Sequence, residues 1–130
     1  MSAEPDNVAV VDQGFVRAPR ERVYELVRDP DRYPNWWPAV AARAAKVGFP
    51  LLGEVSCRVE VVKDGIEIVV RVEGSRATGH LLWYLETFKD GTIAYVVTNV
   101  TTARRWSARR VLRHRTSMRV GLLALARALE

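Results

Sequence analysis

The chain has little cysteine, little histidine and no long hydrophobic run, and each shortage excludes a class of protein. Its 130 residues include one cysteine and two histidines. A single cysteine excludes a disulfide framework within the chain. The spacing of Cys57, His80 and His114 matches no metal-ligand motif, so neither a metal nor another cofactor is expected. No run approaches the roughly 18 apolar residues of a membrane span. The N-terminus is acidic and polar, unlike a signal peptide, so the expected compartment is the cytoplasm.

Acidic residues are scarce only near the C-terminus. The formal net charge is +5, yet residues 103–130 carry eight arginines and one acid, and residues 1–102 carry 12 basic and 14 acidic side chains. Trp106 is the only aromatic residue of the basic segment, which leaves few rings to stack on bases. The net charge is therefore weak evidence for binding to nucleic acid. It indicates which surface an acidic partner would approach.

Hydrophobic side chains alternate along several segments, as they do in half-buried strands. We expect a helix over 19–28, followed by a short helix that Asp29 caps, that Pro30 begins and that runs to Pro38. Two-faced strands of this kind belong to an antiparallel sheet with one dry side. The expected strands are 8–18, 39–47, 53–62, 66–73, 78–88 and 92–101.

Residues 104–130 are expected to form one long amphipathic helix. Gly121 lies at the edge of its apolar stripe, where it either lets the helix approach the sheet or leaves room for a group between them. A helix stripe and a dry sheet face must bury each other. The expected fold class is therefore α+β: a curved antiparallel sheet of six or seven strands wrapped around the C-terminal helix, with two short helices after the first strand. Residues 1–130 form a single domain. The stripe consists of Val111, Met118, Leu122, Leu125 and Leu129.

This order of elements and several short motifs resemble the START-like superfamily (SRPBCC, helix-grip fold), and within it the polyketide cyclase/dehydrase type. The resemblance spans nearly the whole chain and implies a deep apolar cavity between the sheet and the last helix. Residues 26–38 also resemble the coenzyme Q-binding and ribosome-associated toxin branch, with a poorer match beyond Pro50. The motifs are Ala18-Pro19, Tyr33-Pro34-x-Trp36-x-Pro38-x-Val40, Trp83-x-Leu85-Glu86 with Asp90-Gly91-Thr92, and Gly121-Leu122…Leu125…Leu129-Glu130.

The candidate catalytic residues are His114 and Arg115. By helical phase His114 lies on the inward side of the long helix, where an imidazole can hold a ligand oxygen or act as acid or base in a cyclisation. Arg115 flanks the stripe and could orient an enolate or a carboxylate. The alternative is that the helix becomes regular only near Met118, which leaves both side chains in a solvated first turn.

The candidate ligand-binding residues are mostly aromatic. Trp36 matches the family position and is expected in the core, whereas Trp37 is expected at the cavity entrance. A two-residue turn at 90–91 places Trp83 on the inner face, and a three-residue turn brings Tyr95 there as well. We favour the two-residue turn, so Trp83 is the first choice and Tyr95 the reserve. The stripe residues Met118 and Leu122 complete the set.

The resemblance implies that the domain binds a hydrophobic small molecule, such as a lipid, an aromatic compound or a polyketide. Whether it also acts as a cyclase or dehydrase stays open, and an acyl carrier protein would then be a coherent acidic partner. One alternative is a lipid or quinone carrier of the coenzyme Q-binding type without enzymatic activity. Another is a protein that contacts RNA or the ribosome through Arg105, Arg109 and Arg113. Either a monomer or a homodimer is compatible with the chain.

Overall fold

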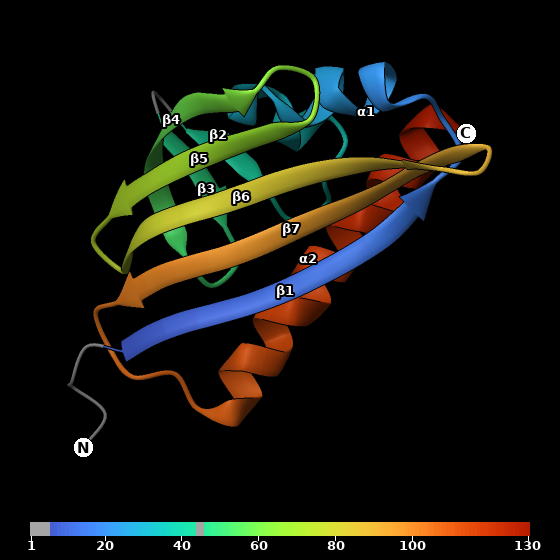
Figure 1. Ribbon diagram of the computed structural model, residues 1–130. Coiled ribbons are helices and arrows are strands. Elements are labelled where there is room, and N and C mark those ends of the chain that lie inside the picture. Colours follow the sequence, from blue (N-terminus) through green and yellow to red (C-terminus); the bar gives the residue numbers. More distant parts are fainter. Residues whose placement is uncertain (1–5, 44–45) are drawn as a thin grey trace.

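A computed structural model describes residues 6–43 and 46–130. Within these residues the protein has one curled sheet, two α-helices and one 3₁₀ helix (Figure 1). The elements are β1 (Asp6–Val16), α1 (Arg20–Val27), the 3₁₀ helix η1 (Pro30–Asn35), β2 (Ala41–Arg43), β3 (Lys46–Phe49), β4 (Gly53–Lys63), β5 (Glu67–Gly74), β6 (Ala77–Phe88), β7 (Gly91–Thr102) and α2 (Ala108–Leu129).

The seven strands form one antiparallel sheet in the order β1-β7-β6-β5-β4-β3-β2. The first strand of the chain therefore pairs with the last. Helix α2 follows β7 and runs along one side of the curled sheet, back toward α1 (Figure 1). This arrangement confirms the predicted helix-grip fold. The strand predicted at 39–47 is instead two short strands, β2 and β3, and residues 44–45 between them lie outside the described part of the chain.

The short helices begin where the sequence predicts. Pro19 occupies the N-cap of α1, and the Asp29 side chain accepts a hydrogen bond from the Asp31 amide at the start of η1, at 3.2 Å. Tyr33 ties the two helices together, because its hydroxyl donates to the Val27 carbonyl at 2.6 Å. Burial raises the pKa of this phenol well above its usual value, so Tyr33 stays a donor.

The long helix begins later than predicted. Residues 103–107 form a loop, and Ser107 caps α2 by accepting a hydrogen bond from the Arg110 amide at 3.2 Å. Trp106 is 8% exposed and anchors this loop against the interior. A buried tryptophan followed by a serine cap stops the helix from extending backward to residue 104. None of the described helices combines the length and apolarity that a membrane crossing needs.

The β6–β7 turn is one residue earlier than predicted. Phe88 pairs with Gly91, so Lys89 and Asp90 form the two-residue turn, with Lys89 at φ +54°. Gly91 is the first residue of β7, and a Cβ there would lie 2.3 Å from the Val16 carbonyl oxygen, which favours glycine at this position. Both versions of the turn contain two residues, so the predicted facing holds and Trp83 points into the core.

Candidate functional site

A buried polar pair lies between β7 and α2. The His114 Nε2 atom is 2.8 Å from the Thr98 hydroxyl oxygen, and His114 is 1% exposed. Because α2 starts at Ala108, residue 114 already lies in regular helix, which contradicts the alternative of a solvated first turn. The structure thus places His114 inward, at the phase that the apolar stripe predicts.

Burial controls the charge of this histidine. Loss of solvation lowers the His114 pKa to about 4, and the nearby Asp12 carboxylate opposes the shift without reversing it. At neutral pH the imidazole is therefore uncharged, with one ring nitrogen that donates and one that accepts. A neutral imidazole in an apolar interior can bind a carbonyl or hydroxyl group, or exchange a proton with it.

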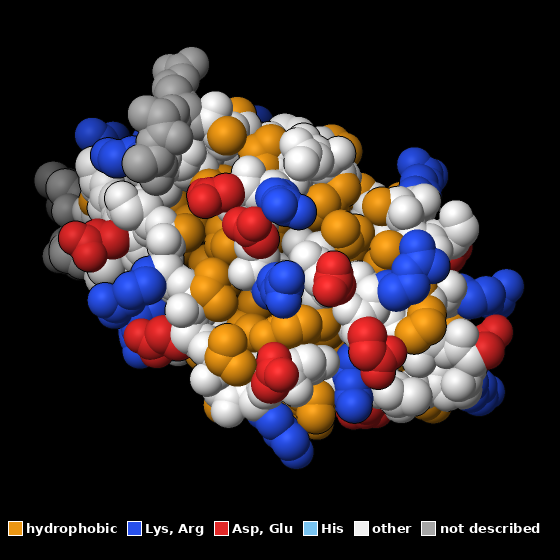
Figure 2. Space-filling view, turned by 90° about the horizontal axis from the view of Figure 1, so that it is seen from above, with side chains coloured by type: hydrophobic (Ala, Val, Ile, Leu, Met, Phe, Trp, Pro, Cys, Tyr) orange, Lys and Arg blue, Asp and Glu red, His pale blue; other side chains and the backbone are white. Residues whose placement is uncertain are grey.

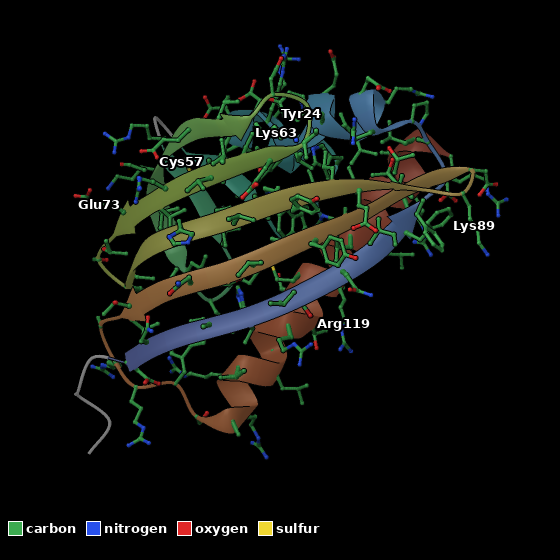
Figure 3. The ribbon with its side chains drawn as sticks, viewed as in Figure 1. Tyr24, Cys57, Lys63, Glu73, Lys89 and Arg119 are labelled. Atoms are coloured by element: carbon green, nitrogen blue, oxygen red, sulfur yellow. The ribbon has the colours of Figure 1, made fainter. Side chains whose placement is uncertain are left out.

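Arg115 does not share this environment. Its Nε atom lies 3.2 Å from Asp12 Oδ1 and its Nη2 atom 3.3 Å from the Val11 carbonyl oxygen. Arg119, which lies one turn further along α2 and is labelled in Figure 3, adds a contact of 3.6 Å to the same carboxylate oxygen. The Arg115 guanidinium thus joins α2 to β1 through its Nε and Nη2 donors.

Asp12 and Thr98 were not identified from the sequence. Asp12 is 3% exposed, and its Oδ2 atom has no hydrogen-bond partner among the described residues. Both residues occupy inward positions of strands whose other inward residues are mostly apolar, as the neighbours Val10 and Val96 illustrate. A polar residue that interrupts an apolar alternation is the signal that could have revealed them.

The two adjacent tryptophans are buried in the opposite order to the one predicted. Trp37 is the core residue, at 1% exposure, and Trp36 is half-buried and stacks on it at a centroid distance of 5.6 Å. Gly121 explains the arrangement, since a Cβ there would lie 2.3 Å from Trp37 Cε2. The indole Nε1 donates to the Ser117 carbonyl at 3.3 Å. The glycine in α2 therefore leaves room for Trp37.

The other predicted ligand-binding residues divide between the two faces of the sheet. Trp83, Met118 and Leu122 are at most 4% exposed and pack in the interior. Tyr95 faces the opposite side of the sheet, where its ring lies 6.0 Å from that of Tyr84. Tyr95 is thus remote from the His114 side of the sheet.

The space between the sheet and α2 is occupied by large side chains over much of its length. Tyr33, Trp37, Trp83, Leu81, Met118 and Leu125 are among the largest fully buried side chains. These side chains occupy much of the space in which the resemblance implies a deep cavity. An open hollow lies instead at one end of the interior, beside the start of α2.

This hollow, which we call the arginine cleft, has a volume of about 490 Å³. Trp106 belongs to its wall and also packs on His114, with the two ring centroids 5.4 Å apart. The Trp106 ring therefore separates the arginine cleft from the buried histidine. The cleft is lined by Leu51, Ser75, Arg76, Ala103, Arg104, Trp106, Arg110 and Arg113.

Cys57 is half-buried on β4 (Figure 3). Burial, with a smaller contribution from Asp31, raises the pKa of its thiol to about 11, so the reactive thiolate is scarce at neutral pH. No group of three or more His, Cys, Asp or Glu side chains within the described ranges could hold a metal ion.

Comparisons with known proteins agree with this architecture. The family model described as polyketide cyclase/dehydrase and lipid transport matches residues 16–123. A comparison with curated proteins finds no match. Among solved structures, a START superfamily protein from Mycobacterium smegmatis is 14% identical, with 93% of this chain and 96% of that chain covered and a TM-score of 0.71.

Two further structures are similar. The Aha1 dimer from Colwellia psychrerythraea is 19% identical, with 95% of this chain and 96% of that chain covered and a TM-score of 0.65. DynU16, a protein in the dynemicin biosynthetic locus, is 21% identical with a TM-score of 0.67; 93% of this chain but only 46% of that chain is covered. At these identities the similarity establishes the shared fold.

Proposed function

Because the chain belongs to the polyketide cyclase/dehydrase and lipid transport family, we propose that it binds a hydrophobic small molecule that carries an oxygen function. The family and the START-like fold support a domain for hydrophobic ligands. The ligand enters through the arginine cleft and displaces the Trp106 ring, and its apolar part takes the place of that ring beside His114. Its oxygen reaches His114.

The observation that carries this proposal is the neutral His114 behind Trp106. A buried histidine in an apolar interior costs solvation energy, and its partner Thr98 offers only a single hydroxyl. Trp106 belongs to an irregular loop, so its ring can move without disrupting a helix or a strand. Met118 lies in the same interior, and its unbranched side chain adapts readily to a ligand's shape.

Native mass spectrometry of protein purified from its source organism tests the binding function. We expect a bound molecule that dissociates on denaturation. Titration with the neutral fluorescent probe N-phenyl-1-naphthylamine provides a second measurement on ligand-free protein. The proposal fails if the purified protein has only the mass of its chain and the probe does not bind.

A matched pair of ligands tests His114 itself. 2-Acetylnaphthalene and 2-ethylnaphthalene have the same ring and differ by one carbonyl oxygen. A hydrogen bond from His114 should make the ketone bind about three- to tenfold more tightly. His114→Ala should abolish this preference, whereas His80→Ala, at the other histidine, should retain it. An equal preference in all three proteins would exclude His114 as the contact.

Cyclisation or dehydration of a polyketide chain is a second candidate function. It rests on the uncharged imidazole, which can accept a proton from a substrate carbon or return one to a leaving oxygen. Confinement of the chain between the sheet and α2 would supply the restriction of conformation. If His114→Ala leaves turnover of a candidate polyketide unchanged, the acid–base role is wrong.

A further inference from the structure

We propose that the arginine cleft binds the anionic group, a carboxylate or a phosphate, of the ligand whose apolar part enters the interior. The inference rests on the proposed function and specifies its ligand as an amphipathic acid. Four segments of the chain build the cleft: the β3–β4 connection, the β5–β6 turn, the β7–α2 loop and the first turns of α2.

Four guanidinium groups line this one hollow, and no acidic side chain of the described residues does. Arg76 comes from the β5–β6 turn, Arg104 from the β7–α2 loop, and Arg110 and Arg113 from α2. Within the described ranges none of the four forms an ion pair, whereas Arg17, Arg71 and Arg115 each contact a carboxylate.

The charges on another face of the molecule are mixed. On the face shown in Figure 2, Lys and Arg side chains alternate with Asp and Glu side chains. Like charges that converge on one hollow repel each other, and an anion bound between them relieves this repulsion. An arginine also offers a planar fork of donors that matches a carboxylate or a phosphate.

The remaining lining gives the cleft two chemically distinct sides. Ser75 adds a hydroxyl beside the arginines, and Leu51 and Trp106 provide the apolar side that leads to His114. A volume of about 490 Å³ lies in the range of small-molecule sites. The geometry therefore suits a single molecule with its acidic group among the arginines and its apolar body toward Trp106.

Two probes of nearly the same shape test the inference. 8-Anilinonaphthalene-1-sulfonate is anionic, and N-phenyl-1-naphthylamine is the neutral compound with the same rings. The wild-type protein should bind the anionic probe more tightly. Arg110→Gln/Arg113→Gln should lower the affinity for the anionic probe about tenfold, equivalent to about 1.4 kcal/mol. The same variant should change the affinity for the neutral probe less than twofold. Dodecanoate and dodecyl phosphate should displace the anionic probe from the wild-type protein and less effectively from the variant.

Arg105→Gln/Arg109→Gln is the matched control, since it removes the same charge from the same end of the helix but at residues that do not line the cleft. This variant should bind both probes within twofold of the wild-type protein. The four arginines that the two double variants replace are all exposed, so both variants should fold. Circular dichroism verifies this.

The outcomes separate the two proposals. If the neutral probe does not bind the wild-type protein and no molecule co-purifies with it, the proposed function fails. If the neutral probe binds but Arg110→Gln/Arg113→Gln leaves the affinity for the anionic probe unchanged, the arginine cleft is not the anion site and the proposed function stands. Equal weakening in both double variants indicates a general effect of charge and overturns the inference.

Discussion

At the scale of single residues, His114 makes stability depend on pH. Its pKa is about 4 in the folded protein, against an ordinary value of 6.5. Between these values the unfolded chain binds more protons than the folded one. The contribution of neutral His114 to the free energy of unfolding is therefore fully present above pH 6.5 and is lost as the pH falls toward 4. The expected loss over this window is about 3 kcal/mol.

Urea unfolding at several pH values between 7.5 and 4 measures this loss. The wild-type curve contains the contributions of all titrating groups, so the comparison with His114→Gln isolates one of them. The variant should lose about 3 kcal/mol less than the wild-type protein over the window. His80→Gln serves as control and should keep the wild-type slope; a parallel curve for His114→Gln would contradict the prediction.

Gly121 and Trp37 form a second residue-scale pair. Alanine is the better helix former by about 1 kcal/mol, but its Cβ would lie 2.3 Å from Trp37 Cε2. A clash with a buried ring costs about 1–3 kcal/mol, so Gly121→Ala should destabilise the protein despite the gain in helix propensity. Thermal or urea unfolding measures the difference.

A double variant shows whether Trp37 is the cause. In the Trp37→Leu background the ring is absent, so Gly121→Ala should become neutral or stabilising. If alanine destabilises both backgrounds equally, the glycine serves a purpose other than making room for the indole.

At the scale of elements, β1 and α2 are joined by a buried acid. Asp12 is 3% exposed, and Arg115 contacts it at 3.2 Å and Arg119 at 3.6 Å. Arg115→Gln removes the shorter contact and leaves the carboxylate inside the interface, so we expect a loss of about 2 kcal/mol in the free energy of unfolding. Arg119 is 65% exposed, and Arg119→Gln should cost less than about 1 kcal/mol.

The informative result is whether Arg115→Gln lowers the free energy of unfolding more than Arg119→Gln does. Asp12→Asn in the Arg115→Gln background should recover part of the loss, because the buried charge is then absent. Equal losses for Arg115→Gln and Arg119→Gln would mean that distance and burial do not determine the strength of this link.

The sequence predicted those helices and strands that a pattern within one short segment of the chain can indicate. Alternation identified β4 and β5, the Asp90-Gly91 turn indicated the hairpin of β6 and β7, and proline and aspartate marked both short helices. The start of α2 and the β6–β7 turn were displaced because they depend on distant contacts: Trp106 must reach the interior, and Gly91 must pass close to Val16. Such contacts exist only once β1 lies beside β7.

At the scale of the whole molecule, the same reasoning explains which part of the site could be predicted. The helical period alone placed His114 inward. Its neighbours Asp12 and Thr98 come from strands that are adjacent only through the pairing of β1 with β7. The choice between Trp36 and Trp37 depends on the direction in which the chain leaves η1, where Ala39 has a φ of +68°. The arginine cleft combines four segments, so no local pattern could indicate it.

The pairing of the first strand with the last also predicts that residues 1–130 unfold as one domain. Removal of β1 would expose β7 and the Asp12 link to α2, so neither half of the chain has a complete core. Trp37, Trp83 and Trp106 are at most 8% exposed and report on the packing of sheet against helix. Their fluorescence and the far-ultraviolet circular dichroism should therefore follow a single coincident transition in urea. Calorimetry should give an unfolding enthalpy of about 90 kcal/mol near 60 °C, equal to the van't Hoff value. Separate transitions in the two signals would mean that part of the sheet or of α2 folds independently, and that residues 1–130 do not form one cooperative unit.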